Sequence, residues 1–309
     1  MLIYAHRGAR GNNPEHTIKA YEYAIDRGAD FLDADIQMTK DGVIIIYHDY
    51  ALNPDIVRAQ SGEFIKDKTL IKDLTYEQLQ SYDIGRVNPR SQYAKLFSDQ
   101  KPCDGQRILA LSDFLEWFKL KRWENAKDRA IGLQIEVKYD PSRPDLTHPK
   151  ELIIKNLIEV LQTHGFINDY LEIQAFDWSV LQLIQSYNLK IRTAYLTDNA
   201  MLEKMQSPDN AIAGLFTAGL LLEDFQGSIC QMIAYLGGKI WGPEVDQITE
   251  DSIKDAKANR LDVVPWFNHC SKFKVESSGE YNAKASESIT FDKFKDMGVH
   301  GLIMDWVLE

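Results

Sequence analysis

Residues 2–49 read LIYAHRGARGNNPEHTIKAYEYAIDRGADFLDADIQMTKDGVIIIYHD, and this stretch decides the predicted fold. Its apolar opening, Leu2–Ala5, predicts a short buried strand. Residues 17–27 place apolar side chains at helical spacing, and Gly28 follows where a helix would end. Residues 29–38 then predict a second buried strand. A strand, a helix and another buried strand in this order are typical of a parallel sheet covered by helices.

A hairpin is predicted directly after the second strand. Residues 41–47 combine an Asp-Gly tight-turn signal with an apolar run, and His48 follows. If the run pairs back as a hairpin, His48 returns beside Asp33. Asp33 and Asp35 are two positions apart, so they point to the same side of their strand. Burying acidic side chains inside a barrel costs free energy unless they bind a ligand. We therefore predict that these residues share one binding pocket.

The rest of the chain repeats the alternation of strand and helix. Further strands are predicted at residues 43–47, 131–137, 171–176, 191–196, 239–244, 262–267 and 301–305. Helices are predicted at residues 75–81, 111–123, 150–163, 249–259 and 286–297, after Asp177 and over most of 214–236, with a surface loop at 271–285. The hairpin accounts for the one strand beyond the eight of a TIM-like (β/α)8 barrel. We therefore expect a single barrel domain over residues 1–309. A doubly wound open sheet is the alternative, although no glycine-rich nucleotide fingerprint supports it.

One long segment does not follow this alternation. Residues 50–106 show no clear hydrophobic period and contain several Pro and Gly turn signals. A short helix is predicted to begin at Thr75, because Gln78 stands three positions later as in a capping box. The segment is too long for a plain connection, so we predict a cap or small subdomain inserted into the barrel.

Composition and charge restrict the class of partner. The chain of 309 residues is 44% hydrophobic and 26% charged, as is usual for globular proteins, with a formal net charge of -11. No run rich in Lys and Arg occurs, which argues against nucleic acid as a partner, and no apolar run is long enough to span a membrane. The first strand follows Met1 directly, so no signal peptide is expected and a cytoplasmic location is predicted. Cys103, Cys230 and Cys270 are expected to be free thiols, and the oligomeric state is left open.

Five residues of the opening stretch supply the groups needed to act on a phosphate ester. Two histidines, His6 and His48, can act as acid and base, because imidazole titrates near neutral pH. Arg7 matches the geometry of a phosphate group with its planar guanidinium. Asp33 and Asp35 can hold a hard divalent cation, which adds positive charge. The sequence therefore predicts cleavage of a phosphodiester.

These residues belong to five short motifs in a fixed order: His6-Arg7-Gly8, Pro14-Glu15-His16-Thr17, Asp33-Ala34-Asp35, Thr39-Lys40-Asp41-Gly42 and His48-Asp49. Their order and spacing resemble the glycerophosphodiester phosphodiesterase family of the bacterial type. The resemblance covers nearly the whole chain and is densest in residues 2–54. Residues 50–106 resemble the insertion that this branch of the family carries on the glycerol side.

The resemblance implies metal-dependent hydrolysis of glycerophosphodiesters to sn-glycerol 3-phosphate and an alcohol, through a cyclic phosphate. It implies that His6 and His48 act as general acid and base. A Ca²⁺ or Mg²⁺ ion would be held by Asp33, Asp35 and Glu136. The small-molecule substrate and its phosphate would be contacted by Arg7, Lys138, Glu15, Gln174 and Trp266.

The chain departs from the family pattern at two places. Asp33 stands where the family usually has glutamate, so this ligand reaches one methylene less far. Residues 266–269 read Trp-Phe-Asn-His, where the family has Trp-Thr-Val-Asn, and only the aromatic residue carries over. Asp305-Trp306 resembles a terminal Asp-Tyr pair of the family and is expected to be structural.

Plainer interpretations exist for each residue. His6 and His48 are compatible with buried structural histidines, and Glu136 with Lys138 is compatible with a surface salt bridge. Three alternative functions follow: a lipid-directed phospholipase C-like or D-like phosphodiesterase, a non-catalytic relative that only binds glycerophosphodiesters, and a metal-free structural barrel. The last leaves the clustered motif residues without a role.

Overall fold

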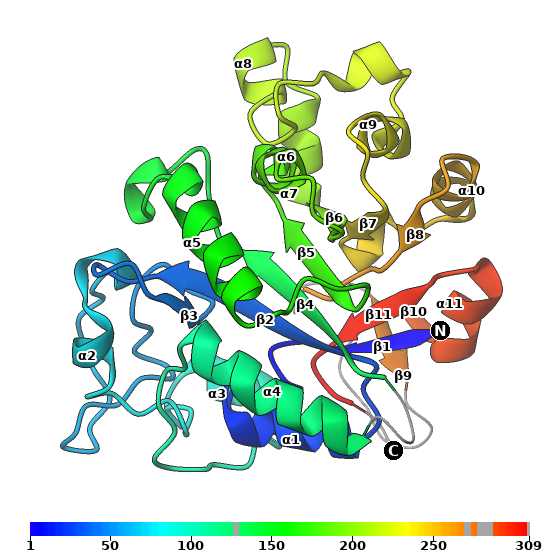
Figure 1. The fold of residues 1–309 in the computed structure, drawn as a ribbon. Coiled ribbons are helices and arrows are strands. Elements are labelled where there is room, and N and C mark those ends of the chain that lie inside the picture. Colours follow the sequence, from blue (N-terminus) through cyan, green and yellow to red (C-terminus); the bar gives the residue numbers. More distant parts are fainter. Residues whose placement is uncertain (126–129, 269–272, 277–286, 308–309) are drawn as a thin grey trace.

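Eight parallel strands form a nearly closed barrel with helices on its outside (Figure 1). The computed structural model describes residues 1–125, 130–268, 273–276 and 287–307. In order of pairing, the strands are β11 (Gly301–Met304), β1 (Leu2–Ala5), β2 (Phe31–Met38), β4 (Gly132–Val137), β5 (Leu171–Ala175), β6 (Arg192–Thr197), β7 (Ile240–Pro243) and β8 (Asp262–Val263). The first and last strands of the described chain are therefore neighbours in the sheet.

Backbone hydrogen bonds bridge the remaining gap, between β8 and β11. His300 N donates to Val263 O at 2.9 Å, and Ile303 N donates to Pro265 O at 3.0 Å. β8 is shorter than the predicted strand, and Pro265 follows it closely without an N–H group to donate. The predicted (β/α)8 barrel is confirmed, and the open doubly wound sheet is wrong.

The extra strand is the predicted hairpin. β3 (Ile44–Ile46) pairs antiparallel with β2, with Ile36 opposite Ile46. The pairing continues past β3, since Tyr47 N donates to Asp35 O at 2.9 Å. His48 follows and so lies next to the strand that carries both aspartates, as the sequence predicts.

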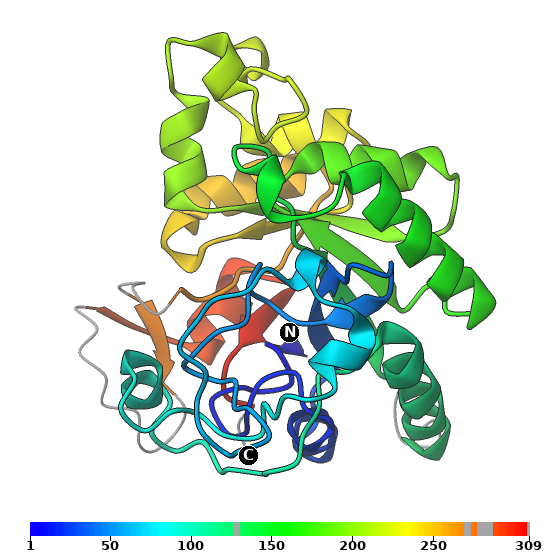
Figure 2. The same ribbon diagram turned by 90° about the vertical axis from the view of Figure 1, so that its left-hand side faces the viewer.

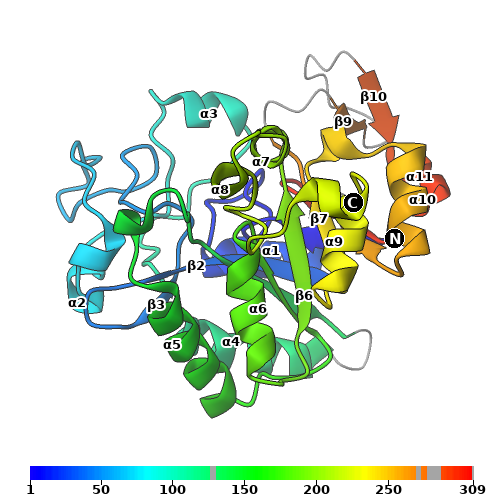
Figure 3. The same cartoon turned by 90° about the horizontal axis from the view of Figure 1, so that it is seen from above.

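Helices pack around the outside of the barrel (Figures 1 and 3). They are α1 (Ile18–Asp26), α4 (Leu111–Asn125), α5 (Lys150–Thr163), α6 (Trp178–Ser186), α7 (Asn199–Met205), α8 (Asn210–Ala213), α9 (Ile229–Tyr235), α10 (Glu250–Ala258) and α11 (Phe291–Met297). Short 3-10 helices lie at Pro144–Leu146 (η2), Leu222–Phe225 (η3) and Val245–Gln247 (η4). Thr17 begins α1 by accepting from Ala20 N, and Asp177 begins α6 by accepting from Ser179 N. No helix in the described ranges is both long and apolar enough to cross a membrane.

Alternation along the strands separates the apolar core from a polar interior. On β4, Leu133 and Ile135 belong to the large cluster that packs against the helices. Gln134 and Glu136 therefore face the other side, which is the inside of the barrel, although both are also buried. On this strand the interior of the barrel is thus lined by polar side chains that need partners.

A stacked pair of aromatic rings fills the barrel near the amino-terminal ends of its strands. The rings of Tyr4 and Phe31 lie parallel with their centroids 4.5 Å apart. Two glycines make room for them. A Cβ atom at Gly132 would lie 2.2 Å from the Phe31 ring, and one at Gly301 would lie 2.6 Å from the Tyr4 ring.

The residues between β3 and α4 lie over one side of the barrel (Figure 2). They carry η1 (Ile71–Asp73), α2 (Tyr76–Leu79) and α3 (Gln92–Leu96). The capping box predicted at Thr75 is present, with Gln78 as its second member, although α2 is shorter than the predicted helix. Their apolar side chains form a cluster separate from the barrel core, which contains Tyr47, Leu52, Ile56, Val57, Ile71, Leu79, Ile84 and Ile108.

Two secondary-structure predictions are wrong. Residues 214–236 are not mostly helical, because left-handed backbone at Ala218 and Gln226 interrupts them, and only η3 and α9 remain. The last predicted helix begins at Phe291 rather than at residue 286. The preceding residues form β10 (Glu287–Thr290), which pairs in parallel with β9 (Phe273–Glu276) inside the stretch predicted as a surface loop. The remainder of that loop and Cys270 lie outside the described residues.

Candidate active site

A cavity of about 280 Å³ lies at the carboxyl ends of the barrel strands. Seven of the ten predicted site residues line it: His6, Arg7, His48, Glu136, Lys138, Gln174 and Trp266. The other three, Glu15, Asp33 and Asp35, do not line this cavity and lie buried next to the residues that do. The placement agrees with the position of active sites in barrels of this kind.

His6 follows β1 and is fixed by the end of β11. Its Nδ1 lies 2.6 Å from Asp305 Oδ1, and Arg10 Nε donates to the same oxygen at 2.6 Å. Burial and the neighbouring Arg10 lower the pKa of His6 to about 3, against the opposing effect of Asp305. Burial would raise the pKa of Asp305, but Arg10 and His6 hold it far below its usual range. An ionised Asp305 accepts a hydrogen bond from Nδ1–H of a neutral His6, which leaves Nε2 for a substrate.

His48 is held in the same way by its sequence neighbour. Its Nδ1 lies 2.6 Å from Asp49 Oδ1, and Asn53 Nδ2 donates to Asp49 Oδ2 at 2.7 Å. Burial, Arg7 and Lys138 lower the pKa of His48 to about 4. The cavity is therefore lined by two neutral histidines, each oriented by one carboxylate.

Arg7 connects the two buried carboxylates beneath the cavity. Its Nη1 donates to Glu15 Oε1 at 3.0 Å, and its Nε forms an ion pair with Asp35 Oδ2 at 3.2 Å. The hydroxyl of Tyr93 donates to the other oxygen of Glu15. Arg7 has left-handed backbone (φ 51°), as does His16 (φ 58°), so this loop is strained where it presents its cation.

Asp33 and Asp35 accept hydrogen bonds from different sides. Asp33 Oδ1 accepts from Gln174 Nε2 at 2.8 Å, and its Oδ2 accepts from Arg7 N at 3.3 Å. Asp35 Oδ2 lies 2.9 Å from His16 Nε2, whereas Asp35 Oδ1 is buried without a hydrogen-bond partner.

Glu136 adds a third carboxylate on the neighbouring strand. It is the register partner of Asp35, and Lys138 Nζ donates to Glu136 Oε1 at 2.6 Å. Burial raises the pKa of Glu136 to about 7, with Lys138 opposing and Asp35 adding to the shift. Burial, Asp35 and Glu136 raise the pKa of Asp33 well above its usual range. The three carboxylates therefore repel one another.

The donor set fits a hard cation in its chemistry. Mutual repulsion among three carboxylates is a feature that a bound cation relieves. Asp35 Oδ1 is buried with no hydrogen bond among the described residues, and only Lys138 Nζ, 3.7 Å away, pairs with it. Within the described ranges, however, no three His, Cys, Asp or Glu side chains converge closely enough to hold an ion. Lys138 and Arg7 occupy part of the space between the acids.

Four residues of this site were not predicted as members. Asp305 was expected to be structural and instead orients His6, and Arg10 pairs with Asp305. Asp49 orients His48. His16 bridges Asp35 and the Tyr21 hydroxyl, which lies 2.9 Å from its Nδ1. The position of Asp305 at the end of a predicted strand was the available signal, because parallel strand ends meet at one rim.

Comparison with known proteins identifies the family of the chain. The profile of the glycerophosphoryl diester phosphodiesterase family matches residues 6–309. The chain is 32% identical over 199 residues to the Bacillus subtilis protein YhdW, covering 64% of this chain and 66% of that protein. It is 43% identical over 81 residues to the glycerophosphodiester phosphodiesterase of Bacillus altitudinis, covering 26% and 29% of the two chains. The matched stretches thus span less than two thirds of either relative.

Solved structures share the fold. A Silicibacter pomeroyi crystal structure superposes with a TM-score of 0.78 at 22% identity, over 99% of this chain and 90% of that chain. An Oleispira antarctica phosphodiesterase, solved with the product sn-glycerol-3-phosphate, gives a TM-score of 0.63 at 17% identity, over 99% and 93% of the two chains. Profile, relatives and fold agree, and the chain belongs to the glycerophosphoryl diester phosphodiesterase family.

Proposed function

We propose that the protein is a glycerophosphodiester phosphodiesterase, which hydrolyses small glycerophosphodiesters to sn-glycerol 3-phosphate and an alcohol. The observation that carries the proposal is the pair of carboxylate-oriented histidines, His6 with Asp305 and His48 with Asp49, in one cavity with Arg7. Family membership and the names of the relatives support the same reaction.

The two histidines act as general base and general acid. One accepts the proton of the glycerol 2-hydroxyl as this oxygen attacks phosphorus, and the other gives a proton to the departing alcohol. Water then opens the cyclic phosphate with the roles reversed. Arg7 and Lys138, which line the cavity with both histidines, stabilise the negative charge that develops on the phosphate oxygens.

Asp33, Asp35 and Glu136 hold a divalent cation in this proposal, either Ca²⁺ or Mg²⁺. Support comes from their mutual repulsion and from Asp35 Oδ1, which has no hydrogen bond within the described residues and only the distant Lys138 Nζ, at 3.7 Å, as an ion-pair partner. A bound ion supplies positive charge next to the phosphate. Lys138 and Arg7 contact these acids and also line the catalytic cavity, so both would face the substrate phosphate.

The remaining predicted residues complete the pocket. Gln174 and Trp266 line the cavity and contact substrate, and Glu15 holds Arg7 in place. Residues 50–106 form a cap within a single catalytic barrel domain. Asn53 and Lys68 from this segment line an adjoining cavity beside His48.

The test is the release of glycerol 3-phosphate from glycerophosphocholine, glycerophosphoethanolamine and glycerophosphoglycerol. Reactions run in parallel with EDTA, Ca²⁺ and Mg²⁺, and the His6→Ala/His48→Ala double variant serves as the control. Release that depends on added metal and on the two histidines is the expected result. No release from any of the three diesters with either metal would exclude the proposed reaction.

A further inference from the structure

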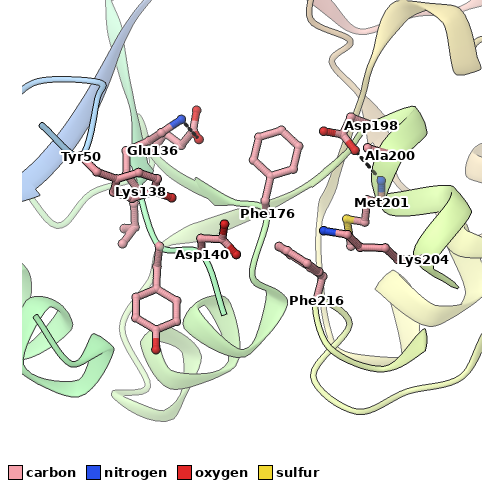
Figure 4. A pocket seen from close by; sticks show the side chains of 12 residues that line it. Tyr50, Glu136, Lys138, Asp140, Phe176, Asp198, Ala200, Met201, Lys204 and Phe216 are labelled. Carbon is pink, nitrogen blue, oxygen red and sulfur yellow. Dashed lines mark hydrogen bonds and ion pairs between the residues drawn. The ribbon is translucent and has the colours of Figure 1, made fainter. Parts of the chain in front are cut away.

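A second cavity, of about 230 Å³, adjoins the catalytic cavity. Four residues line both, namely Glu136, Lys138, Phe176 and Asp198. In Figure 4, Phe176 stands between Lys138 and Asp140 on one side and Asp198 and Lys204 on the other. A group that leaves the phosphate past Phe176 therefore enters a space bounded by the ends of β4 and β6 and by α7.

Two carboxylates in this second cavity have no cationic partner among the residues that the structure describes. Asp140 accepts from the backbone and hydroxyl of Ser142, at 2.8 and 2.6 Å. Asp198 begins α7 and accepts from Met201 N at 2.6 Å. Neither aspartate forms an ion pair with a lysine, arginine or histidine in the part of the chain that the structure describes.

Aromatic rings make up much of the remaining lining, and two of them already contact ammonium groups. Lys204 Nζ lies 4.3 Å from the centroid of the Phe216 ring, and Lys150 Nζ lies 5.5 Å from that of Tyr139. Aromatic faces attract ammonium ions. The Phe176 ring stands edge to face with Trp266, at a centroid distance of 5.6 Å, and so keeps its place between the two cavities.

The strand that ends just before Phe176, β5, also presents a buried acceptor without a donor among the described residues. Gln174 is 2% exposed and lines the catalytic cavity. Its amide nitrogen donates to Asp33, whereas its amide oxygen is buried without a hydrogen-bond partner. An oxygen acceptor in this position calls for a substrate group that donates a hydrogen bond or carries positive charge.

The adjoining cavity on the other side of His48 has the opposite character. It is lined by two lysines, Lys68 and the shared Lys138, and its one carboxylate, Asp49, is already bonded to His48 and Asn53. A cationic group would be repelled there. The second cavity also has two lysines, Lys138 and Lys204, but three carboxylates line it. The α7 side is thus the better match for positive charge.

We propose that the second cavity binds the leaving alcohol and selects an ammonium headgroup through Asp140, Asp198 and Phe176. This inference rests on the proposed function and names the substrate class for it: glycerophosphodiesters of amino alcohols, with glycerophosphoethanolamine as the primary ammonium case. Lys204, which has no acidic partner within ion-pair distance in the described chain, opposes the selection.

The experiment measures the ratio of kcat/KM for glycerophosphoethanolamine to that for glycerophosphoglycerol, whose headgroup is neutral. In wild type this ratio is expected to exceed unity severalfold. Asp140→Asn/Asp198→Asn is expected to lower the ratio about 5- to 30-fold, because a charge-assisted contact is lost while both amides keep their local hydrogen bonds. Lys204→Met is expected to raise the ratio about 3- to 10-fold, since it removes the opposing charge.

The matched control is Asp209→Asn, which changes the N-cap of α8 outside the cavity and should leave the ratio unchanged. A ratio within twofold of wild type in the double aspartate variant would overturn the headgroup site while leaving the hydrolytic function intact. A wild-type ratio at or below unity would also overturn the headgroup site. A wild-type protein that hydrolyses none of the diesters would overturn both proposals together.

Discussion

Asp35 and Glu136 lie opposite each other in the register of β2 and β4, and both face the inside of the barrel. Their repulsion contributes to the raised pKa of Glu136. Lys138 Nζ lies 2.6 Å from Glu136 Oε1 but 3.7 Å from Asp35 Oδ1, which makes no hydrogen bond in the part of the chain that the structure describes. Paired acids at this point are costly for the folded protein alone, which makes a bound cation the natural stabiliser.

The first prediction concerns this cation. EDTA should abolish hydrolysis, and Glu136→Gln should raise the metal concentration needed for half-maximal activity by about 10-fold or more. Titration of activity with Ca²⁺ and Mg²⁺ measures this concentration. The control is Glu172→Gln, the same change at another fully buried position inside the barrel. An unchanged metal requirement in Glu136→Gln would remove this glutamate from the ligand set.

The second prediction concerns the orientation of His6. His6→Ala should lower kcat about 10²–10⁴-fold, as expected for loss of a general acid or base. Asp305→Asn should lower kcat by about tenfold or more, because the imidazole loses the carboxylate that fixes its tautomer. His164→Ala is the matched control, since His164 is also paired with a carboxylate, Glu116, at 2.6 Å, but away from the cavity. Near-wild-type turnover in both site variants would contradict the assignment.

The third prediction concerns His16, which is 1% exposed and contacts Asp35 and Tyr21. His16→Phe should lower the free energy of unfolding by about 2 kcal/mol or more, because two buried polar groups lose a partner. His16→Asn should cost less, since asparagine tolerates the left-handed backbone at this position. Urea denaturation of the three proteins measures the difference. A His16→Phe protein as stable as wild type would show that the contacts of His16 contribute nothing, and equal stabilities for Phe and Asn would show that the left-handed backbone adds no cost.

The fourth prediction concerns pH. Burial raises the pKa of Glu172 to about 7, from an ordinary value of 4.5, although Arg192 opposes the shift. Between these two values the folded protein holds a proton that the unfolded chain has released, so stability falls as pH rises through this window. Between pH 4.5 and 7, the free energy of unfolding of wild type should fall by up to about 3 kcal/mol relative to that of Glu172→Gln. Urea denaturation of both proteins across this pH range measures the difference in stability. A difference that does not change with pH would contradict the prediction.

The fifth prediction concerns the stacked rings inside the barrel. Gly132→Ala should destabilise the protein by about 1–3 kcal/mol through overpacking, because Phe31 is stacked on Tyr4 and cannot turn aside. Phe31→Leu frees the space, so the double variant should be more stable than the sum of the single changes predicts. Additive losses in thermal or urea unfolding would show that the two positions do not interact.

Much of the barrel was accessible from local sequence. Buried parallel strands have continuous apolar runs, and the Asp-Gly turn before Val43 identified the extra strand as a hairpin. The structure of residues 214–236 could not be predicted in the same way. Their apolar content suits a helix, but left-handed backbone at Ala218 and Gln226 interrupts it, and neither residue type signals this conformation.

The residues of the candidate site also differ in whether local sequence could predict them. His6, Arg7 and His48 stand in motifs within a short stretch, so their proximity followed from one strand, one helix and one hairpin. The contact between His6 and Asp305 joins residues separated by 299 positions. Such a contact depends on closure of the whole barrel, and neither residue type nor local pattern distinguishes it from a structural aspartate.

The pairing of β1 with β11 has a consequence for synthesis of the chain. Leu2 pairs with Gly301, and Ala5 pairs with Met304. While the protein emerges from the ribosome, β1 has only β2 as a neighbour. Its other edge stays unpaired until β11 has been translated. The strand addition that seals this edge also delivers Asp305 to His6, so completion of the sheet and assembly of the first histidine–aspartate pair are one event.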